Sequence, residues 1–259
     1  VTRSVALLRK RRVGFIINRI LSDFDKMDEN INCSEMNLQE RRIYAAECSA
    51  GTSHSTIKSF ILRLINSRHF KGRILDYGAG KGDLLELISK QGLFESLSGV
   101  DIMKRPAKLG EHIIWHQQDL NESLQIKNEL TNLVICSEVI EHLENPRATF
   151  RELHRILARK GHLLLTMPNQ ESIRSISGLL LGGHFSHFLG NSYPAHITAL
   201  LKLDLERLCE ETGFLPPQFY YTNSGLIPRL TRISWQRISF GLLRGRFFSD
   251  NIGMIAQKK

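Results

Sequence analysis

The sequence lacks any apolar run of the ~18 to 20 residues that a membrane-spanning helix requires. Its first twenty residues, VTRSVALLRKRRVGFIINRI, hold two short apolar pieces that the basic run 9–12 separates. A secretory signal has one unbroken apolar region and a cleavage site of small residues, and this segment has neither. We therefore expect a cytoplasmic protein.

Cysteines are few and widely spaced. The four cysteines, at positions 33, 48, 136 and 209, form no Cys-x-x-Cys pair. Cys136 lies in an apolar run, where a buried and unreactive thiol is expected. This spacing excludes a structural zinc site and favours a reducing compartment. The absence of any internal repeat excludes a solenoid.

Acidic residues are scarce at both ends of the chain. Residues 1–20 carry six basic and no acidic side chains, and residues 222–259 carry seven basic and one acidic. Since the whole chain has a net charge of +9, the middle, 21–221, is left with −3. A uniformly basic domain would indicate nucleic acid. A near-neutral body with two basic ends indicates that the ends face an anionic partner, unless they are simply solvated.

The middle of the chain alternates between strand and helix patterns. We expect helices at 38–48, 55–66 (capped by Ser55), from 83 onward, 146–157 and 201–212. We expect strands at 74–76, 97–101, 113–117, 133–137, 163–167, 214–222 and 252–257. Pro216 and Pro217 confine the strand at 214–222 to a sheet edge or a late start. The alternation predicts an α/β fold with a mostly parallel sheet and helices on both faces.

A glycine turn joins the first strand to its helix in the segment ILDYGAGKGDLLELI, residues 74–88. Backbone N–H groups and the helix dipole at such a turn bind anionic or polar ligands. The glycines are Gly78, Gly80 and Gly82, whereas a dinucleotide fingerprint needs a glycine at the position of Asp83. Asp83 would also repel a diphosphate there. No Gly-Lys-Ser/Thr ending follows, so the turn matches neither a pyrophosphate nor a triphosphate.

Carboxylates follow three successive strands. Asp76 precedes the glycines and suits a ligand with positive charge, while Asp101 ends the second strand, where a carboxylate binds ribose hydroxyls. Asp119 follows the third strand, and next to Leu120 it is placed to accept from an exocyclic amine while the leucine packs on an adenine face. The carboxyl ends of parallel strands share one crevice, so we expect these residues to form one site.

With these features the chain resembles the class I S-adenosylmethionine-dependent methyltransferases. The matching segments are ILDYGAGKG, GVDI, QQDL, LVICSEVIEHLENP and RILARKGHLLLTMPN. Of these, SEVIEHLENP is most similar to the branch that includes ubiquinone-pathway O-methyltransferases and many sugar or antibiotic methyltransferases.

The resemblance implies a Rossmann-like, seven-stranded sheet whose last strand, at 252–257, runs antiparallel. It also implies S-adenosyl-L-methionine as the cofactor. In the family, the glycine loop and the acid before it, here Asp76, lie at the methionine part. The family's ribose and adenine acids carry over to Asp101 and to Asp119 with Leu120. Ser137, at the tip of the fourth strand, would lie beside the methionine part.

Methyl transfer to a hydroxyl also needs a group that accepts its proton. His142 is the first candidate for this general base, and Glu138 is the second catalytic candidate, with Glu141 as a neighbour. In the alternative to catalysis, Glu138 and His142 only shape the cofactor pocket or cap a helix. In a further alternative, Glu138, Glu141 and His142 share one helical face and hold a divalent ion with His196, as in related branches. We do not include a metal among the expected cofactors.

The expected organisation is an N-terminal segment, 1–54, and a methyltransferase domain, 55–259. Residues 169–196 are expected to form a lid over the acceptor site, with His187 and His196 as reserve bases. A basic insertion at 226–248, LIPRLTRISWQRISFGLLRGRFF, carries five arginines and no acid. Its composition suits an anionic membrane surface. If the insertion were a helix, its apolar residues would surround the cylinder, which instead favours packing on the body or on a second subunit.

The favoured function is O-methylation of a small-molecule, sugar or lipid-linked acceptor. An RNA 2′-O-methyltransferase with a metal at Glu138, Glu141 and His142 is the first alternative, although the acidic middle of the chain speaks against it. A cofactor-binding protein without catalysis is the second.

Overall fold

The computed structural model describes residues 36–49 and 51–259. The chain divides into two units, 1–41 and 42–259. In the first unit the structure describes the start of helix α2 (Leu38–Cys48). The Asn37 side chain accepts from the Glu40 N–H at 3.0 Å, and the Glu40 carboxylate accepts from the Asn37 N–H at 2.8 Å. This reciprocal pair caps the helix. What we expect of residues 1–35 lies outside the described residues.

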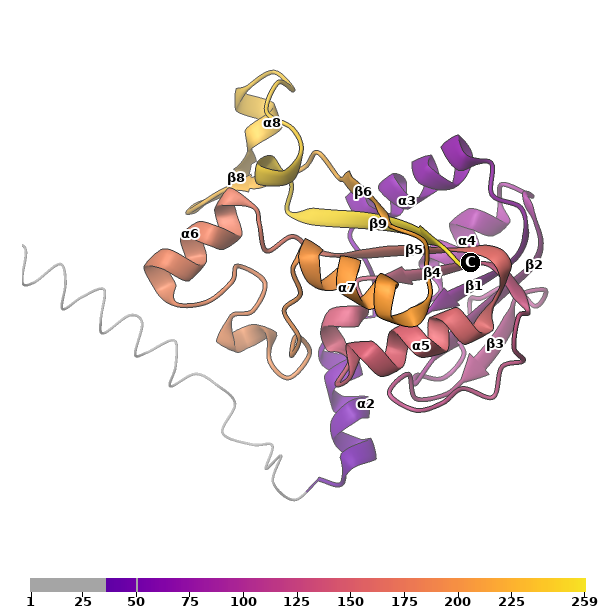
Figure 1. The fold of residues 1–259 in the computed structure, drawn as a ribbon. Coiled ribbons are helices and arrows are strands. Elements are labelled where there is room, and N and C mark those ends of the chain that lie inside the picture. Colours follow the sequence, from indigo (N-terminus) through magenta and orange to yellow (C-terminus); the bar gives the residue numbers. More distant parts are fainter. Residues whose placement is uncertain (1–35, 50) are drawn as a thin grey trace, which may run out of the picture. The chain divides into compact units, whose positions relative to one another are not determined.

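The second unit is built on a seven-stranded sheet in the order β3-β2-β1-β4-β5-β9-β6 (Figure 1). The strands are β1 (Gly72–Tyr77), β2 (Phe94–Asp101), β3 (Ile114–Gln117), β4 (Thr131–Ser137), β5 (Leu157–Pro168), β6 (Gln218–Tyr221) and β9 (Asn251–Gln257). Strands β1 to β5 pair in parallel, and β9 runs antiparallel to both β5 and β6. The predicted α/β sheet with an antiparallel last strand is therefore confirmed.

Helices cover both faces of this sheet (Figure 1). One face packs against α5 (Pro146–Ile156) and α7 (Lys202–Thr212), through a core that includes Phe150 and Leu205. The other packs against α3 (Ser55–Arg68) and α4 (Asp83–Ser89), through a core that includes Ile61 and Leu85. The later parts of β4 and β5 are buried on both faces, and these parts contain the apolar runs 133–136 and 163–165.

Two expected details are wrong. The N-cap of α3 is His54, whose Nδ1 accepts from the Thr56 N–H at 3.3 Å, so Ser55 is the first helical residue instead of the cap. The first residues of the strand expected at 214–222 are not part of it, because the strand begins at Gln218, immediately after the two prolines, which have no N–H to donate; this is the late start that the prolines predict. It does lie at the edge of the sheet, as the prolines predict.

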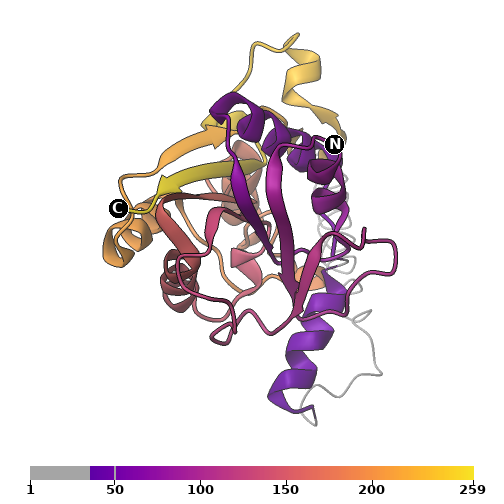
Figure 2. The same ribbon diagram turned by 90° about the vertical axis from the view of Figure 1, so that its right-hand side faces the viewer.

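Two additions extend this framework. After β5 the chain forms α6 (Ile173–Gly182) and the short helix η2 (Gly190–Ser192). Between β6 and β9 it forms β7 (Leu226–Ile227), β8 (Leu230–Ser234), α8 (Trp235–Ile238) and η3 (Arg246–Phe248). Figures 1 and 2 show this second addition standing off the edge of the sheet. None of the described helices combines the length and hydropathy needed to cross a bilayer.

Candidate functional site

The glycine turn after β1 requires glycine for two reasons. Gly78, Gly80 and Gly82 have φ angles of 82°, 51° and 73°, which other residues rarely adopt. A Cβ atom on Gly80 would lie 2.3 Å from the carbonyl oxygen of Gly51. The same oxygen accepts from the Lys81 N–H at 2.8 Å, so the chain around residue 51 lies directly over the turn.

Asp76 and Asp101 meet at this turn from adjacent strands. Asp101 accepts from the Gly80 N–H at 2.8 Å and from the Met103 N–H at 2.9 Å, which ties the end of β2 to the turn. Asp76 is buried, and burial, followed by the charge of Asp101, raises its pKa to about 7. Burial also raises the pKa of Asp101. Two buried carboxyls side by side favour a ligand that brings positive charge and hydroxyl donors.

Asp119 lies just beyond β3 and is held by a residue that the sequence did not single out. Arg42, in α2, donates to Asp119 at 2.9 Å, to Glu122 at 2.7 Å and to Glu144 at 2.7 Å. This arginine therefore joins the Asp119 loop to the segment that follows β4. Leu120 is buried, and its carbonyl accepts from the hydroxyl of Tyr77 at 2.9 Å.

Asp83, the first residue of α4, is ion-paired with Lys58 at 3.2 Å and with Lys108. The hydrogen bond from Lys108 contributes most to lowering its pKa to about 2. The charge of Asp83 is thus already compensated, and the predicted repulsion of a diphosphate is weaker than the sequence indicates. The missing glycine at this position still distinguishes the turn from a dinucleotide fingerprint.

A second group of side chains lies at the carboxyl end of β4. The Ser137 hydroxyl contacts the Thr166 hydroxyl at 3.0 Å. Glu138 follows with a φ of +54°, and one of its carboxylate oxygens accepts from the Asn251 amide at 2.7 Å. Its other oxygen is buried without a hydrogen-bond partner, and burial raises the Glu138 pKa to about 7. Asn251 comes from β9, so sequence spacing gives no sign of this contact.

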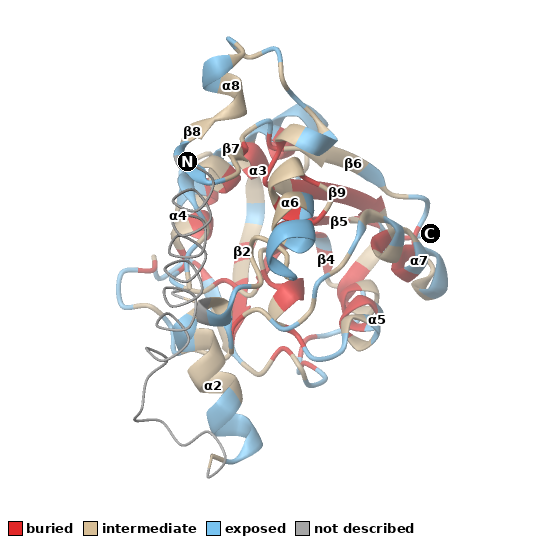
Figure 3. Cartoon of the chain, turned by 90° about the vertical axis from the view of Figure 1, so that its left-hand side faces the viewer, coloured by how far each residue is buried: buried red, intermediate tan, exposed pale blue. Residues whose placement is uncertain are grey.

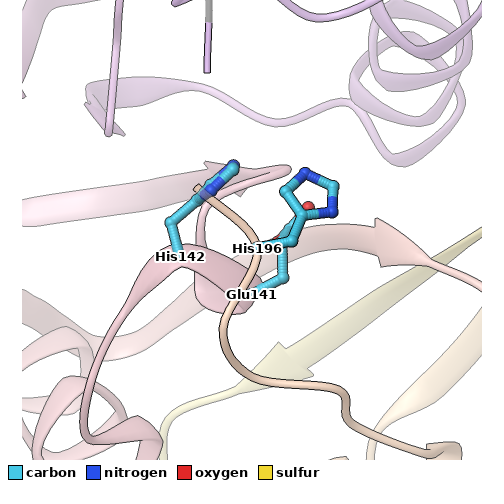
Figure 4. A group of neighbouring side chains, drawn as sticks. All are labelled: Glu141, His142 and His196. Carbon is cyan, nitrogen blue, oxygen red and sulfur yellow. The ribbon is translucent and has the colours of Figure 1, made fainter. Parts of the chain in front are cut away.

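Glu141, His142 and His196 converge next to this group (Figure 4). Glu141 and His142 lie in the short helix η1 (Ile140–His142), and His196 follows η2. One ligand atom from each lies within 4.8 Å of the others, and both Glu141 oxygens are buried without a partner. The described residues thus place an unpaired carboxylate beside two imidazoles, whose ring centroids lie 4.7 Å apart.

Backbone carbonyls orient both imidazoles. His142 Nδ1 lies 2.8 Å from the carbonyl oxygen of Ala195, and His196 Nδ1 lies 2.6 Å from that of His187. A carbonyl oxygen only accepts, so these contacts assign the proton to Nδ1 in each neutral ring and leave Nε2 unprotonated. Burial lowers the His142 pKa to about 4, so the ring is neutral at pH 7. Neutral imidazoles held in this way are suited to binding a cation, whereas the lowered pKa of His142 makes it a weaker proton acceptor than an exposed histidine.

The expectation that Glu138, Glu141 and His142 share one helical face is wrong. Glu138 adopts a left-handed conformation before the helix, which begins only at Ile140, so its carboxylate turns to Asn251 instead. His196, which we expected as a fourth ligand and a reserve base, lies beside Glu141 and His142 where Glu138 was expected. His187 is half-buried, with its pKa lowered by burial to about 4, and its carbonyl accepts from His196.

Comparison with known sequences shows where this chain is similar to others. A family profile described as "Methyltransferase domain" matches residues 50–215. The ubiquinone biosynthesis O-methyltransferase of Vibrio vulnificus (strain YJ016) is 24% identical over 121 residues, which cover 44% of this chain and 50% of that protein. The mitochondrial enzyme of the same name from Rattus norvegicus is 27% identical over 119 residues, 42% of this chain and 34% of that protein. The chain thus spans half or less of the length of these relatives.

Solved structures with the same fold include two methyltransferases. A SAM-dependent methyltransferase from Archaeoglobus fulgidus superposes with a TM-score of 0.56 at 21% identity, covering 83% of this chain and 99% of that one. The 1,6-didemethyltoxoflavin-N1-methyltransferase of Burkholderia thailandensis superposes with a TM-score of 0.56 at 13% identity, covering 85% and 88%. At these identities the likeness shows the fold alone.

Proposed function

The chain belongs to the class I S-adenosylmethionine-dependent methyltransferase family, and from that membership we propose that it methylates a hydroxyl group of a small molecule. The curated relatives act in ubiquinone biosynthesis, so a hydroxylated ring of that type is the first acceptor to test. A sugar hydroxyl and a lipid-linked hydroxyl belong to the same proposal.

The turn after β1 and its acids fit the cofactor. When bound, S-adenosylmethionine supplies a methyl group activated by a sulfonium centre. Asp76 and the three glycines would hold its methionine part, Asp101 its ribose hydroxyls, and Asp119 with Leu120 its adenine. The buried carboxyls of Asp76 and Asp101 suit a positively charged ligand better than a diphosphate. Ser137, at the tip of β4, is assigned to the wall beside the methionine part.

The group at the end of β4 carries the proposal for the chemistry. His142 presents an unprotonated Nε2 and would accept the proton of the acceptor hydroxyl as the methyl group is transferred. The second catalytic candidate, Glu138, would lie near that proton, because one of its carboxylate oxygens is buried without a hydrogen-bond partner. The lid residue His196 completes the wall on the side of the acceptor.

One observation favours a second reading of the same residues. Both oxygens of Glu141 are buried with no donor, which is costly unless a ligand pairs with them. Glu141, His142 and His196 together offer the carboxylate and imidazole ligands that divalent transition ions prefer. An ion there would lower the pKa of a bound hydroxyl, which makes a separate base unnecessary. The two readings share the reaction and differ in how the hydroxyl loses its proton.

A labelling assay tests the reaction first. The protein is incubated with S-adenosylmethionine carrying a labelled methyl group and with a phenolic acceptor or a cell extract, with and without RNase. Label in a small molecule that survives RNase is the expected result. Label that disappears with RNase would favour the RNA alternative, and cofactor binding without any labelled product would favour the non-catalytic one.

Chelation then separates the two readings. If His142 is the base, His142→Gln should lower turnover by roughly 10²-fold or more, and EDTA should have no effect. If an ion is held, EDTA should abolish turnover and Mg²⁺ or Mn²⁺ should restore it, and Glu141→Gln should weaken binding of the ion in calorimetry. His112→Gln, on an exposed histidine, is the matched control.

A further inference from the structure

The most exposed apolar side chains of the described chain gather in two neighbouring segments. Phe240 is 96% exposed and Leu242 84%, both in the addition 226–248, while Leu180 is 77% and Leu181 72% exposed, both in α6. No other large apolar side chain in residues 36–49 and 51–259 is as exposed as these four. Figure 3 shows exposed residues on α6, which lies in front of the buried strands, and on α8, which stands beyond them.

The addition and α6 are joined at their bases. The Asn169 amide donates to the carbonyl of Arg246 at 2.7 Å and to that of Ser249 at 2.8 Å. Arg246 also pairs with Glu171, 2.7 Å away, and α6 contacts β7 directly. The two segments thus form one unit at the carboxyl end of β5, which we name the α6–insert surface: residues 173–182 and 226–248.

The insert has its own internal support. The Gln236 amide donates to the carbonyls of Leu243 and Phe248 at 2.8 and 2.9 Å, and the ring of Trp235 packs on that of Phe248 with centroids 5.5 Å apart. The segment is a hairpin followed by two short helices instead of one helix. Because the insert is not one helix, the spacing of its apolar residues does not decide which of them pack on the body. Phe240 and Leu242 do not pack there and stay exposed to solvent.

The charge of this surface has one sign. All five arginines of the insert, Arg229, Arg232, Arg237, Arg244 and Arg246, are exposed, and the insert contains no acidic residue. Among the described residues, only Arg246 of these five has an ion-pair partner. In the sequence, Arg237 and Arg244 flank a stretch that contains Ile238, Phe240 and Leu242.

We propose that the α6–insert surface docks on an anionic lipid bilayer. Exposed leucine and phenylalanine side chains enter the acyl boundary of a membrane, while arginines beside them bind lipid phosphates. Leucine pairs such as 180–181 offer no stacking face for nucleic-acid bases. A two-fold interface would set the five arginines of one copy against those of the other, with no acid in the insert to separate them. The charge pattern therefore favours lipid over RNA or a second copy.

Co-sedimentation with vesicles tests this proposal on the full chain. Vesicles of phosphatidylcholine alone are compared with vesicles that also contain phosphatidylglycerol, at low and at high salt. We expect binding to the phosphatidylglycerol vesicles that weakens with salt, and little binding to phosphatidylcholine alone. Each Arg→Gln substitution at Arg232 or Arg237 should lower the partition coefficient about five-fold.

Matched variants separate the surface from general effects. Phe240→Asp with Leu242→Asp should lower vesicle binding roughly ten-fold or more, because the apolar contribution is lost as well. Leu93→Asp changes an exposed leucine at the amino end of β2, away from the α6–insert surface, and Arg63→Gln removes an exposed arginine from α3. These two controls should bind vesicles like the parent, and unchanged binding of S-adenosylhomocysteine shows that all variants are folded.

Three results would overturn the proposal. The first is equal binding to both kinds of vesicle, or none at low salt. The second is vesicle binding that the insert variants leave unchanged. The third is loss of dimer or of RNA binding in the Phe240→Asp, Leu242→Asp variant while vesicle binding is absent in the parent. None of these depends on methyl transfer, so the proposed function and this proposal fail independently.

Discussion

Replacing Asp76 with asparagine should make the ligand-free protein more stable and bind its cofactor less tightly. Burial raises the pKa of this carboxyl from 3.8 to about 7. A carboxyl with a higher pKa in the folded than in the unfolded state binds its proton more tightly when folded. Its ionisation therefore lowers the free energy of unfolding as pH rises from about 4 to about 7, with no further change above.

The size of the effect follows from the two pKa values. At about pH 8 the charge of Asp76 costs the folded state roughly 4 kcal/mol, and at about pH 5 it costs roughly 1.5 kcal/mol. Asparagine has nearly the same shape and no charge, so it removes this cost at both pH values. The stability gap between Asp76→Asn and the parent should thus widen by about 2 to 3 kcal/mol, or about 5 to 10 °C in Tm, between these two pH values.

Thermal denaturation without ligand at about pH 5 and about pH 8 measures this gap. Glu95→Gln, which neutralises an exposed carboxylate on β2, is the control and should show no such widening. Calorimetry with S-adenosylhomocysteine should show an affinity that rises with pH in the parent, because the ionised carboxylate pairs with the ligand's ammonium, and a weaker, pH-independent affinity in Asp76→Asn. A gap that stays constant with pH, or an unchanged affinity, would refute the reasoning.

Three more substitutions test the site. Asp101→Ala should weaken S-adenosylhomocysteine binding about 10- to 150-fold in calorimetry, since a charge-assisted acceptor is worth roughly 1.5 to 3 kcal/mol; unchanged affinity in a folded protein would exclude the ribose role. Arg42→Gln should weaken the same binding roughly ten-fold, because Asp119, Glu122 and Glu144 lose the cation that they share, whereas Arg63→Gln should leave it unchanged. Equal effects of the two substitutions would contradict the role of Arg42 in holding Asp119 in position. Gly80→Ala should lower stability about 1 to 3 kcal/mol more than Gly92→Ala in urea denaturation, because both have positive φ but only Gly80 would clash with a neighbouring carbonyl; similar losses would show that the clash relaxes.

Most of the sheet follows from local patterns in the sequence. The runs that end at Asp76 and Ser137 are apolar because both faces of the sheet are covered, so the apolar pattern and the turn residues mark them well. β6 is harder to place, because two prolines delay its start by four residues relative to the predicted strand. Its neighbour in the sheet is β9, which lies beyond an insertion that no short-range pattern describes.

The site was predictable only where one segment supplies it. The glycine turn and its acids occur in the expected order along the chain. The partners that fix their geometry come from elsewhere: Arg42 reaches Asp119 across 77 positions. Glu138 was misplaced because the sequence spacing assumed a continuous helical turn, whereas a left-handed residue precedes a shorter one. Backbone conformation at a single residue thus decided which carboxylate joins His142.

The position of β9 between β5 and β6 also sets an order of assembly. The amide of Asn251, its first residue, binds the Glu138 carboxylate 113 positions earlier. At roughly 5 to 20 residues per second, the ribosome needs on the order of ten seconds to make the chain between them. During that time Glu138 lacks this donor, and β6 lacks the neighbour it pairs with in the finished sheet. Completion of the sheet and completion of the Glu138 contact therefore both wait for the synthesis of β9.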